Sequence, residues 1–454
     1  MLQTLIKAWK IADLRKKLIF TAFILLVFRI GSAITIPFVN IGAGGIIPDA
    51  NDSSFLSYLN MMTGDAFNYA TILAMSITPY INSSIIMQLL GVAIPALERL
   101  QKEGEEGRKK IATITRYVTI GLGLMQSTAY YFFLRNQGFL LMRADGSAFT
   151  GFSAVMQALV IIFVLTAGAA LTMWLGERIN EKGIGNGVSM ILFAGIVARL
   201  PRMAAQLFSP DLRVGYFFRG GAYYWLTPIA TLCLLGMVAF IVWMDNAERR
   251  IPVQYAKRVV GRKMYGGQST HIPIKVNMSG VMPVIFASSI LSLPPTIQLF
   301  MRGEPQGFWR SFFSAFEQTN PVYVPIYFVL ILGFAYFYSS IQYDPIEMAN
   351  NIRKNSGAIP GYRPGQPTSD YIKRIINRLT LLGALLLSII ALFPIIFTLL
   401  STWILKFSFG NEQEYGMNIA MGGTSTIIMV GVALETVKQI ESQMMMRHYK
   451  GFLE

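Results

Sequence analysis

The chain has 454 residues, of which 53% are hydrophobic and only 14% are charged, and its formal net charge is +15. The mean hydropathy of +0.48 excludes an ordinary soluble globular domain, and repeated apolar segments of about twenty residues are typical of a polytopic helical membrane protein. The single cysteine, Cys233, excludes a disulfide within the chain.

About ten apolar segments are suited to crossing a bilayer as helices. Their predicted bounds are 18–36, 72–94, 113–134, 154–175, 186–205, 223–244, 280–300, 322–342, 379–400 and 424–444. The two chain ends and the loops 95–116, 176–185, 245–279 and 343–378 then share one side, which carries 29 of the 39 Lys and Arg residues. By the positive-inside rule, that side and both termini are predicted to be cytoplasmic.

The stretch from Ser53 to Leu90 differs from an ordinary span. A short amphipathic run, Phe55 to Met62, ends at Thr63-Gly64-Asp65 and is too short to cross a membrane. Irregular backbone at membrane depth is tolerated only where it is buried in protein or lines a water-filled cavity. We therefore expect either a short helix folded into a cavity as a stopper or, alternatively, a helix on the external surface.

Glycines mark two of the shorter cytoplasmic loops. The 95–116 loop is predicted to be a tight connection between helices around Gly104 and Gly107. The sequence GERINEKGIGNGVSMILF, residues 176–193, contains Asn186, which is predicted to cap the next helix. Nucleotide binding is not expected here, because no strand precedes the Gly-x-Gly run and the third glycine of that fingerprint is missing.

The two longest cytoplasmic loops have more shape than topology alone requires. Residues 249–276 are predicted to form a basic β-hairpin around Gly266-Gly267. In the second loop, Asp344-Pro345 is predicted to start a helix that ends near Gly357, and a Pro- and Gly-rich turn presents Arg363 at its tip. Basic loops also contact anionic lipid, but this shape favours docking of a large cytosolic partner.

The chemistry of an intramembrane enzyme is missing from the sequence. The spans hold few ionisable residues: Arg29 lies in the first span and Glu435 near the predicted cytoplasmic end of the last, and the histidines are His271 and His448. No metal-binding HExxH and no GxxxxGK motif is present, so we expect no catalysis, no metal and no cofactor. A secondary transporter of small solutes remains an alternative, since broken helices and polar midplane residues also occur in that class.

Several long motifs occur together and in order. They are WLGERINEKGIGNG (174–187), QSTHIPIKVNMSGVMPVIFASSI (268–290), PGYRPGQPT (360–368) and GGTST (422–426). With these motifs the chain resembles, over essentially its whole length, the SecY family of channel subunits of the bacterial Sec protein translocase.

The resemblance implies an all-α membrane protein of ten transmembrane helices, in two pseudo-symmetric five-helix halves around a central pore. The halves would comprise residues 1–205 and 206–454, with a plug at about 55–69. Plug residues carried over from the family are Phe55, Leu56, Tyr58, Leu59, Met62 and Gly64.

The family also implies a ring of aliphatic side chains at the waist of the pore, which would exclude ions by dewetting. By motif, the ring falls on Ile77, Ile81, Val188, Leu192, Ile285 and Ile428. A lateral gate would lie between spans 2, 3, 7 and 8, and its candidate polar residues are Gln88, Gln126, Ser288 and Ser289.

The function implied is a passive protein-conducting channel in the plasma membrane. It would move unfolded secretory polypeptides across the membrane and release membrane segments laterally into lipid. The partners implied are SecE-like and SecG-like membrane subunits, the SecA motor ATPase, the ribosome through its RNA, anionic lipid, and signal peptides and nascent chains as substrate. Arg262 and Arg363 are the expected contacts of the motor or the ribosome.

Overall fold

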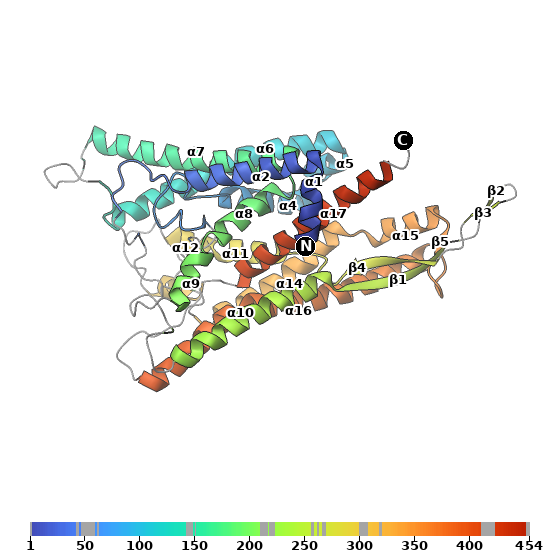
Figure 1. Ribbon diagram of the computed structural model, residues 1–454. Helices are drawn as coiled ribbons and strands as arrows, with labels where there is room; N and C mark the ends of the chain where they lie inside the picture. Colours follow the sequence, from blue (N-terminus) through green and yellow to red (C-terminus); the bar gives the residue numbers. More distant parts are fainter. Residues whose placement is uncertain are drawn as a thin grey trace.

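The computed structural model describes residues 2–41, 45–46, 60, 63–141, 149, 151–208, 217, 223–255, 258–260, 263–265, 269–298, 307–316, 320–409 and 423–450. Long helices lie roughly parallel in two layers, and α8, α11 and α17 lie between the layers (Figure 1). The β-strands project from one end of this bundle, which is therefore the end predicted to be cytoplasmic.

The N-terminal part of the chain supplies the first layer, together with α8. Its helices are α1 (Leu2–Lys10), α2 (Ala12–Gly31), α4 (Thr78–Ala93), α5 (Pro95–Lys102), α6 (Glu105–Asn136), α7 (Phe152–Lys182), α8 (Gly187–Val197) and α9 (Leu200–Phe208). The predicted division of the chain between residues 205 and 206 stays a prediction, and α9 runs across that position.

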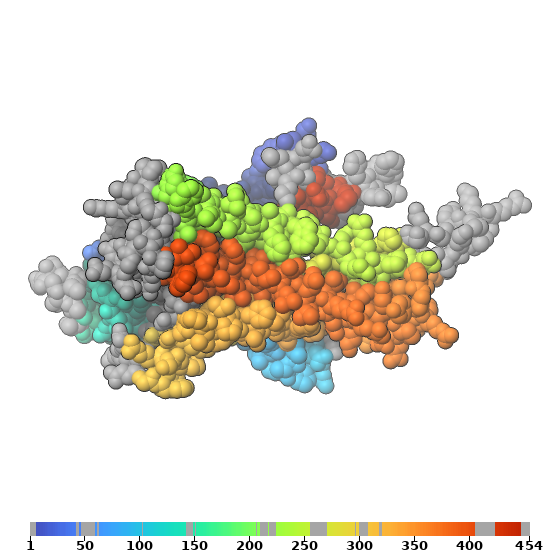
Figure 2. Space-filling view, turned by 90° about the horizontal axis from the view of Figure 1, so that it is seen from below, coloured from blue at the N-terminus to red at the C-terminus, as the bar shows by residue number. Residues whose placement is uncertain are grey.

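The C-terminal part of the chain supplies the second layer, together with α11 and α17. Its helices are α10 (Tyr223–Asn246), α11 (Met282–Leu291), α12 (Leu293–Gln298), α13 (Phe308–Ser314), α14 (Tyr323–Gln342), α15 (Pro345–Lys354), α16 (Gln366–Phe409) and α17 (Gly423–Lys450). From this side, α10 and α16 lie next to each other along the length of the molecule (Figure 2).

Each of the ten predicted spans coincides with a helix or a consecutive helix pair, which confirms the all-α ten-span fold in two halves. By length and hydropathy alone, fewer helices qualify as membrane spans. Among the described residues, five helices are both long enough and apolar enough to cross a membrane, or six if the bent pair α4–α5 counts as one span. The pair bends by 106° at Pro95, which cannot continue the preceding helix and turns α5 back toward α6.

The predicted ends of spans 1 and 2 are wrong. Span 1 was expected to reach residue 36 and span 2 to begin at 72, but α2 ends at Gly31 and α4 begins at Thr78. The apolar residues between them pair with each other instead: the Ile36 amide donates to the Ala70 carbonyl at 2.9 Å, and the Ile72 amide to the Ile34 carbonyl at 2.9 Å. Ile36 and Ala70 are buried whereas Ile34 is 49% exposed, and this pairing satisfies backbone groups of the two segments without a helix.

The glycine loop between α7 and α8 is closely packed. Asn186 caps α8 as predicted, since its side chain accepts from the amides of Val188 and Ser189. A Cβ atom at Gly187 would overlap the Gly176 carbonyl oxygen, so the backbones of α7 and α8 approach more closely there than any other residue would permit.

The two long loops predicted to be cytoplasmic form one unit, which we call the arms. β1 (Glu248–Tyr255) pairs antiparallel with β4 (Ser269–Lys275), which confirms the hairpin, and also with β5 (Gly357–Ala358) from the second loop. Further out, β2 (Arg258–Val260) pairs with β3 (Lys263–Tyr265). The helix start at Asp344 is confirmed, since its carboxylate accepts from the amides of Ile346 and Glu347.

The arms also share an apolar core, which the sequence did not predict. Ile251 and Val253 of β1 pack with Ile352 of α15 and with Ile372 and Ile376 of α16. The two loops therefore form one packed body at the N-terminal end of α16.

Candidate functional site at the boundary between the halves

The six predicted ring residues lie in the molecule's interior rather than on its lipid-facing exterior. Five are buried members of one hydrophobic cluster that spans both halves, and Val188 is half-buried against that cluster. They come from α4 and the N-cap residue before it, and from α8, α11 and α17. The residues of this group are Ile77, Ile81, Val188, Leu192, Ile285 and Ile428.

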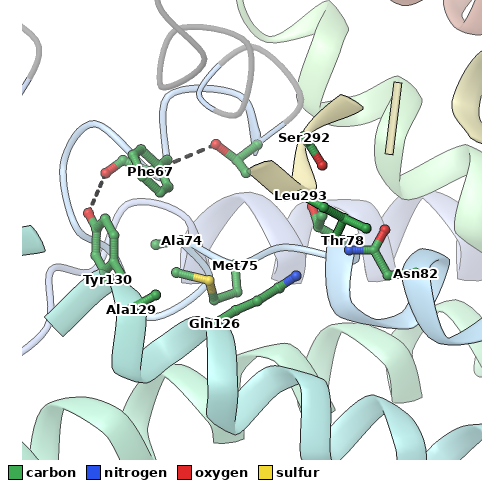
Figure 3. Close-up of a pocket in the computed structure, with 11 residues that line it drawn as sticks. Phe67, Ala74, Met75, Thr78, Asn82, Gln126, Ala129, Tyr130, Ser292 and Leu293 are labelled. Atoms are coloured by element: carbon green, nitrogen blue, oxygen red, sulfur yellow. Dashed lines mark hydrogen bonds between the residues drawn. The ribbon is translucent and has the colours of Figure 1, made fainter. Parts of the chain in front are cut away.

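A pocket lies beside this cluster, where α4 and α6 of the first half meet α11 and α12 of the second (Figure 3). Its walls are mostly apolar, and the polar groups among its lining residues include Thr78, Asn82, Gln126 and Ser292. Asn82 is buried, and its Oδ1 atom has no hydrogen-bond partner among the described residues. An unpaired buried acceptor destabilises this arrangement of the halves, because the group has lost its hydrogen bonds to water without replacement.

One side of the pocket is fixed by the segment that leads into α4. The Tyr130 hydroxyl donates to the Phe67 carbonyl at 2.6 Å, and the Phe67 amide donates to Thr63 Oγ1 at 3.2 Å (Figure 3). This segment is thereby held to α6, so the first half provides a firm wall to the pocket.

The four predicted gate residues do not form hydrogen bonds between the halves in the described part of the chain. Gln126 lines the pocket. Ser288 donates to the Ile285 carbonyl of its own helix at 2.9 Å, and the Ser289 carbonyl accepts from Ser292 at 2.6 Å. Gln88 and Ser289 are half-buried. Asn82 and Ser292 are pocket residues that the sequence reasoning missed, although both are polar residues inside predicted spans.

Of the predicted plug residues, Gly64 is described, and Phe55, Leu56, Tyr58, Leu59 and Met62 lie outside the described residues. Gly64 has a φ of +66°, in the left-handed region that favours glycine. The backbone break expected at this glycine is therefore present.

The turn that carries Arg363 has internal supports. Thr368 Oγ1 donates to the Arg363 carbonyl at 2.8 Å, and the rings of Tyr362 and Tyr371 stack with centroids 4.2 Å apart. The Arg363 side chain is exposed at this turn. Arg262 lies outside the described residues.

The halves also meet on a second seam, between α8 and α17. The Gly185 amide of the glycine loop donates to Gln439 Oε1 on α17 at 2.7 Å, and Thr436 Oγ1 lies 3.5 Å from the Met190 sulfur. Ile184 of the same loop packs with Ile440 of α17 and with Ala8 of α1. The glycine motif thus joins the two halves directly.

Comparison with known proteins decides the family. The family model described as SecY matches residues 71–437. The chain belongs to the SecY family. It is 41% identical to the protein translocase subunit SecY of Mycobacterium tuberculosis over 469 residues and 42% identical to that of Halalkalibacterium halodurans over 463 residues, and each comparison covers 100% of both chains.

Solved structures agree on the fold. A structure titled as a protein-conducting channel has a TM-score of 0.60 at 18% identity, and covers 94% of this chain and 92% of its own. Sec61 in the canine ribosome-channel complex has a TM-score of 0.59 at 18% identity with the same coverage. The prediction of a SecY-family translocase channel subunit, and not an enzyme, is therefore confirmed by the family and its curated relatives.

Proposed function

We propose that the aliphatic cluster between the halves is the waist through which unfolded polypeptides cross the plasma membrane. The observation that carries this is the convergence of Ile77, Ile81, Val188, Leu192, Ile285 and Ile428, from four separate helices, on one interior cluster. Aliphatic side chains make no sequence-specific contacts, so they close around any extended chain, and a narrow apolar ring excludes ions by dewetting.

The experiment is crosslinking of a stalled secretory chain to a photoreactive residue at Ile81 or Ile285. We expect adducts at both positions. The matched control is Ile389 of α16, which is 58% exposed on the outer surface and should give none with a fully secreted chain. Equal labelling at Ile389 and Ile81 would contradict the proposed path.

The pocket supports a lateral exit between α4 and α6 on one side and α11 and α12 on the other. Its apolar walls and its unpaired Asn82 acceptor leave this boundary weakly closed. A hydrophobic signal helix or membrane segment would offset the cost of opening by burying its own apolar surface there. Gln88, Gln126, Ser288 and Ser289 remain candidates for tuning that cost.

The plug, at about residues 55–69, would close the same path from outside. The topology then follows the charge distribution, with both termini, the arms and the glycine loop in the cytoplasm. The halves would divide into residues 1–205 and 206–454, and SecE-like and SecG-like subunits and anionic lipid would cover the apolar exterior.

The arms would receive the SecA motor or the ribosome. An exposed arginine on a supported turn suits bidentate binding of a carboxylate or an RNA phosphate, and Arg363 meets this description. Arg262, on the hairpin loop, is the second candidate.

Arg363→Glu should abolish motor-driven and ribosome-driven transport while the protein still inserts and assembles, because the substitution turns attraction into repulsion. Transport into membrane vesicles measures this. Arg310→Glu, on α13 at the opposite end of the molecule, is the control for a change in net charge and should transport normally. Normal transport by Arg363→Glu would exclude the contact.

A further inference from the structure

Three arginines converge on the end of the plug. Arg199, which follows α8, places Nε 3.3 Å from one oxygen of the Asp65 carboxylate, and Arg202 of α9 places Nη1 3.3 Å from the other. Arg29 of α2 donates from Nη1 to the Gly64 carbonyl at 3.4 Å. All three arginines belong to the N-terminal half, at the end of the molecule away from the arms.

The Asp65 turn is built to hold its carboxylate in place. Asn60 Nδ2 donates to Asp65 Oδ1 at 2.9 Å, the Asp65 amide donates to the Asn60 carbonyl at 3.2 Å, and the Asn68 amide donates to Asn60 Oδ1 at 3.0 Å. Asp65 itself has a φ of +71°, so the turn keeps a side chain in the left-handed region where glycine would be less strained.

The backbone at Gly64 is seated directly on α8. A Cβ atom at Gly64 would lie 2.6 Å from the Gly195 carbonyl oxygen and 3.0 Å from Arg29 Nη1. The ion pairs are also partly shielded from water, since the side chains of Asp65 and Arg199 are 19% and 17% exposed. Partial burial strengthens such a pair relative to one on an open surface.

The second half contacts this region differently. Thr63 and Phe67, on either side of the turn, line the pocket together with Ser292 and Leu293 of the second half. That boundary is an apolar pocket, whereas the boundary with the first half is ionic and hydrogen-bonded. When the halves separate, the end of the plug is therefore held by the first half alone.

We propose that Asp65, bridged to Arg199 and Arg202, is the anchor that positions the plug on the N-terminal half during gating. The attachment of the Asp65 turn to the N-terminal half then stays fixed while the halves separate. This inference rests on the proposed function, since an anchor has a purpose only where the plug closes a channel.

The test uses the chain with its membrane partner subunits, reconstituted in lipid vesicles, with two readouts. The first is potassium leakage through idle channels, and the second is transport of secretory proteins whose signal sequences are graded in hydrophobicity. Asp65→Asn keeps the size of the side chain and removes its charge. We expect about a fivefold rise in idle leakage, as a partly exposed ion-pair network of this kind implies, and better transport of weak signals.

Two comparisons separate an anchor from a general loss of stability. Asp65→Glu keeps the charge and should remain close to the wild type in both readouts. Adding Arg199→Gln and Arg202→Gln to Asp65→Asn should cause no further leakage, because all three act through one carboxylate. Arg135→Gln, at the exposed end of α6, is the matched arginine control and should change nothing.

The anchor proposal would be overturned if Asp65→Asn had the same leakage and signal selectivity as a transporting wild type. Additive effects of the three substitutions would overturn it as well. Should Asp65→Asn fail to assemble, Arg202→Gln provides the same test, because its side chain is 42% exposed and its loss is tolerable to the fold. A wild type that assembles but transports nothing would instead contradict the proposed function.

Discussion

The two seams between the halves are built in opposite ways. On the pocket side, α4 and α6 face α11 and α12 across an apolar pocket, and Asn82 leaves a buried acceptor unpaired. On the other side, the glycine loop and α8 are joined to α17 by the Gly185–Gln439 hydrogen bond and by the packing of Ile184 on Ile440. We therefore expect the pocket seam (the open seam) to open first and the halves to rotate about the seam between α8 and α17 (the held seam).

The largest effect is expected where the held seam depends on close backbone packing. Gly187→Ala places a Cβ atom on the Gly176 carbonyl oxygen, so α8 must shift and carry Gly185 away from Gln439. We expect a loss of about 3 kcal/mol of stability. Thermal unfolding of the purified protein measures it, with Gly236→Ala on α10 as control, since nothing lies within 4 Å of a Cβ there. Equal unfolding temperatures for the two variants would refute the close packing.

A smaller effect of opposite sign is expected on the open seam. Asn82→Leu removes the unpaired acceptor and adds apolar contact in the pocket, which should stabilise the closed arrangement by about 2 kcal/mol. Signal sequences would then have to be more hydrophobic to be exported. Asn277→Leu is the matched control, because Asn277 is also buried with an unpaired Oδ1 but lies outside the pocket. An unchanged signal requirement in Asn82→Leu would show that this pocket does not control opening.

The smallest effect is expected from the hydrogen bond across the held seam. Gln439→Leu removes the acceptor of the Gly185 amide and should cost about 1 kcal/mol or less, because the side chain is exposed and water replaces it in part. Gln439→Glu keeps an acceptor oxygen and should behave like the wild type. Hydrogen exchange at the Gly185 amide is the direct measurement. Equal protection of this amide in the two variants would show that the Gly185–Gln439 hydrogen bond does not contribute to the seam.

Much of the fold could be predicted, because its signals are local. The ten spans follow from apolar runs, and the helix starts at Asn186 and Asp344 follow from capping residues. The errors at Ile34–Ile36 and Ile72–Ile77 have one cause, which is that hydropathy does not report helicity. Ile36 is buried and Ile34 is 49% exposed, and the Ile36 and Ile72 amides pair with the facing segment instead of continuing a helix.

The features that could not be predicted depend on contacts between distant segments. Nothing in the sequence around Asp65 indicates that its partners are Arg199 and Arg202, and the shared core of the arms joins residues more than a hundred positions apart. The ring positions came from the family resemblance, because pairs of aliphatic residues four apart are ordinary in any span. Asn82 could have been selected, since an amide inside an apolar span needs a partner.

The length of α16 has a mechanical consequence. This helix runs for 44 residues, or about 66 Å, from the turn after Arg363 to the far side of the bundle. Its N-terminal end belongs to the core of the arms through Ile372 and Ile376, and its middle packs into the central cluster through Leu387 and Ile390. A force applied to the arms is thus transmitted along α16 to the central cluster. A partner docked on the arms could therefore tilt the helices of that cluster without entering the membrane.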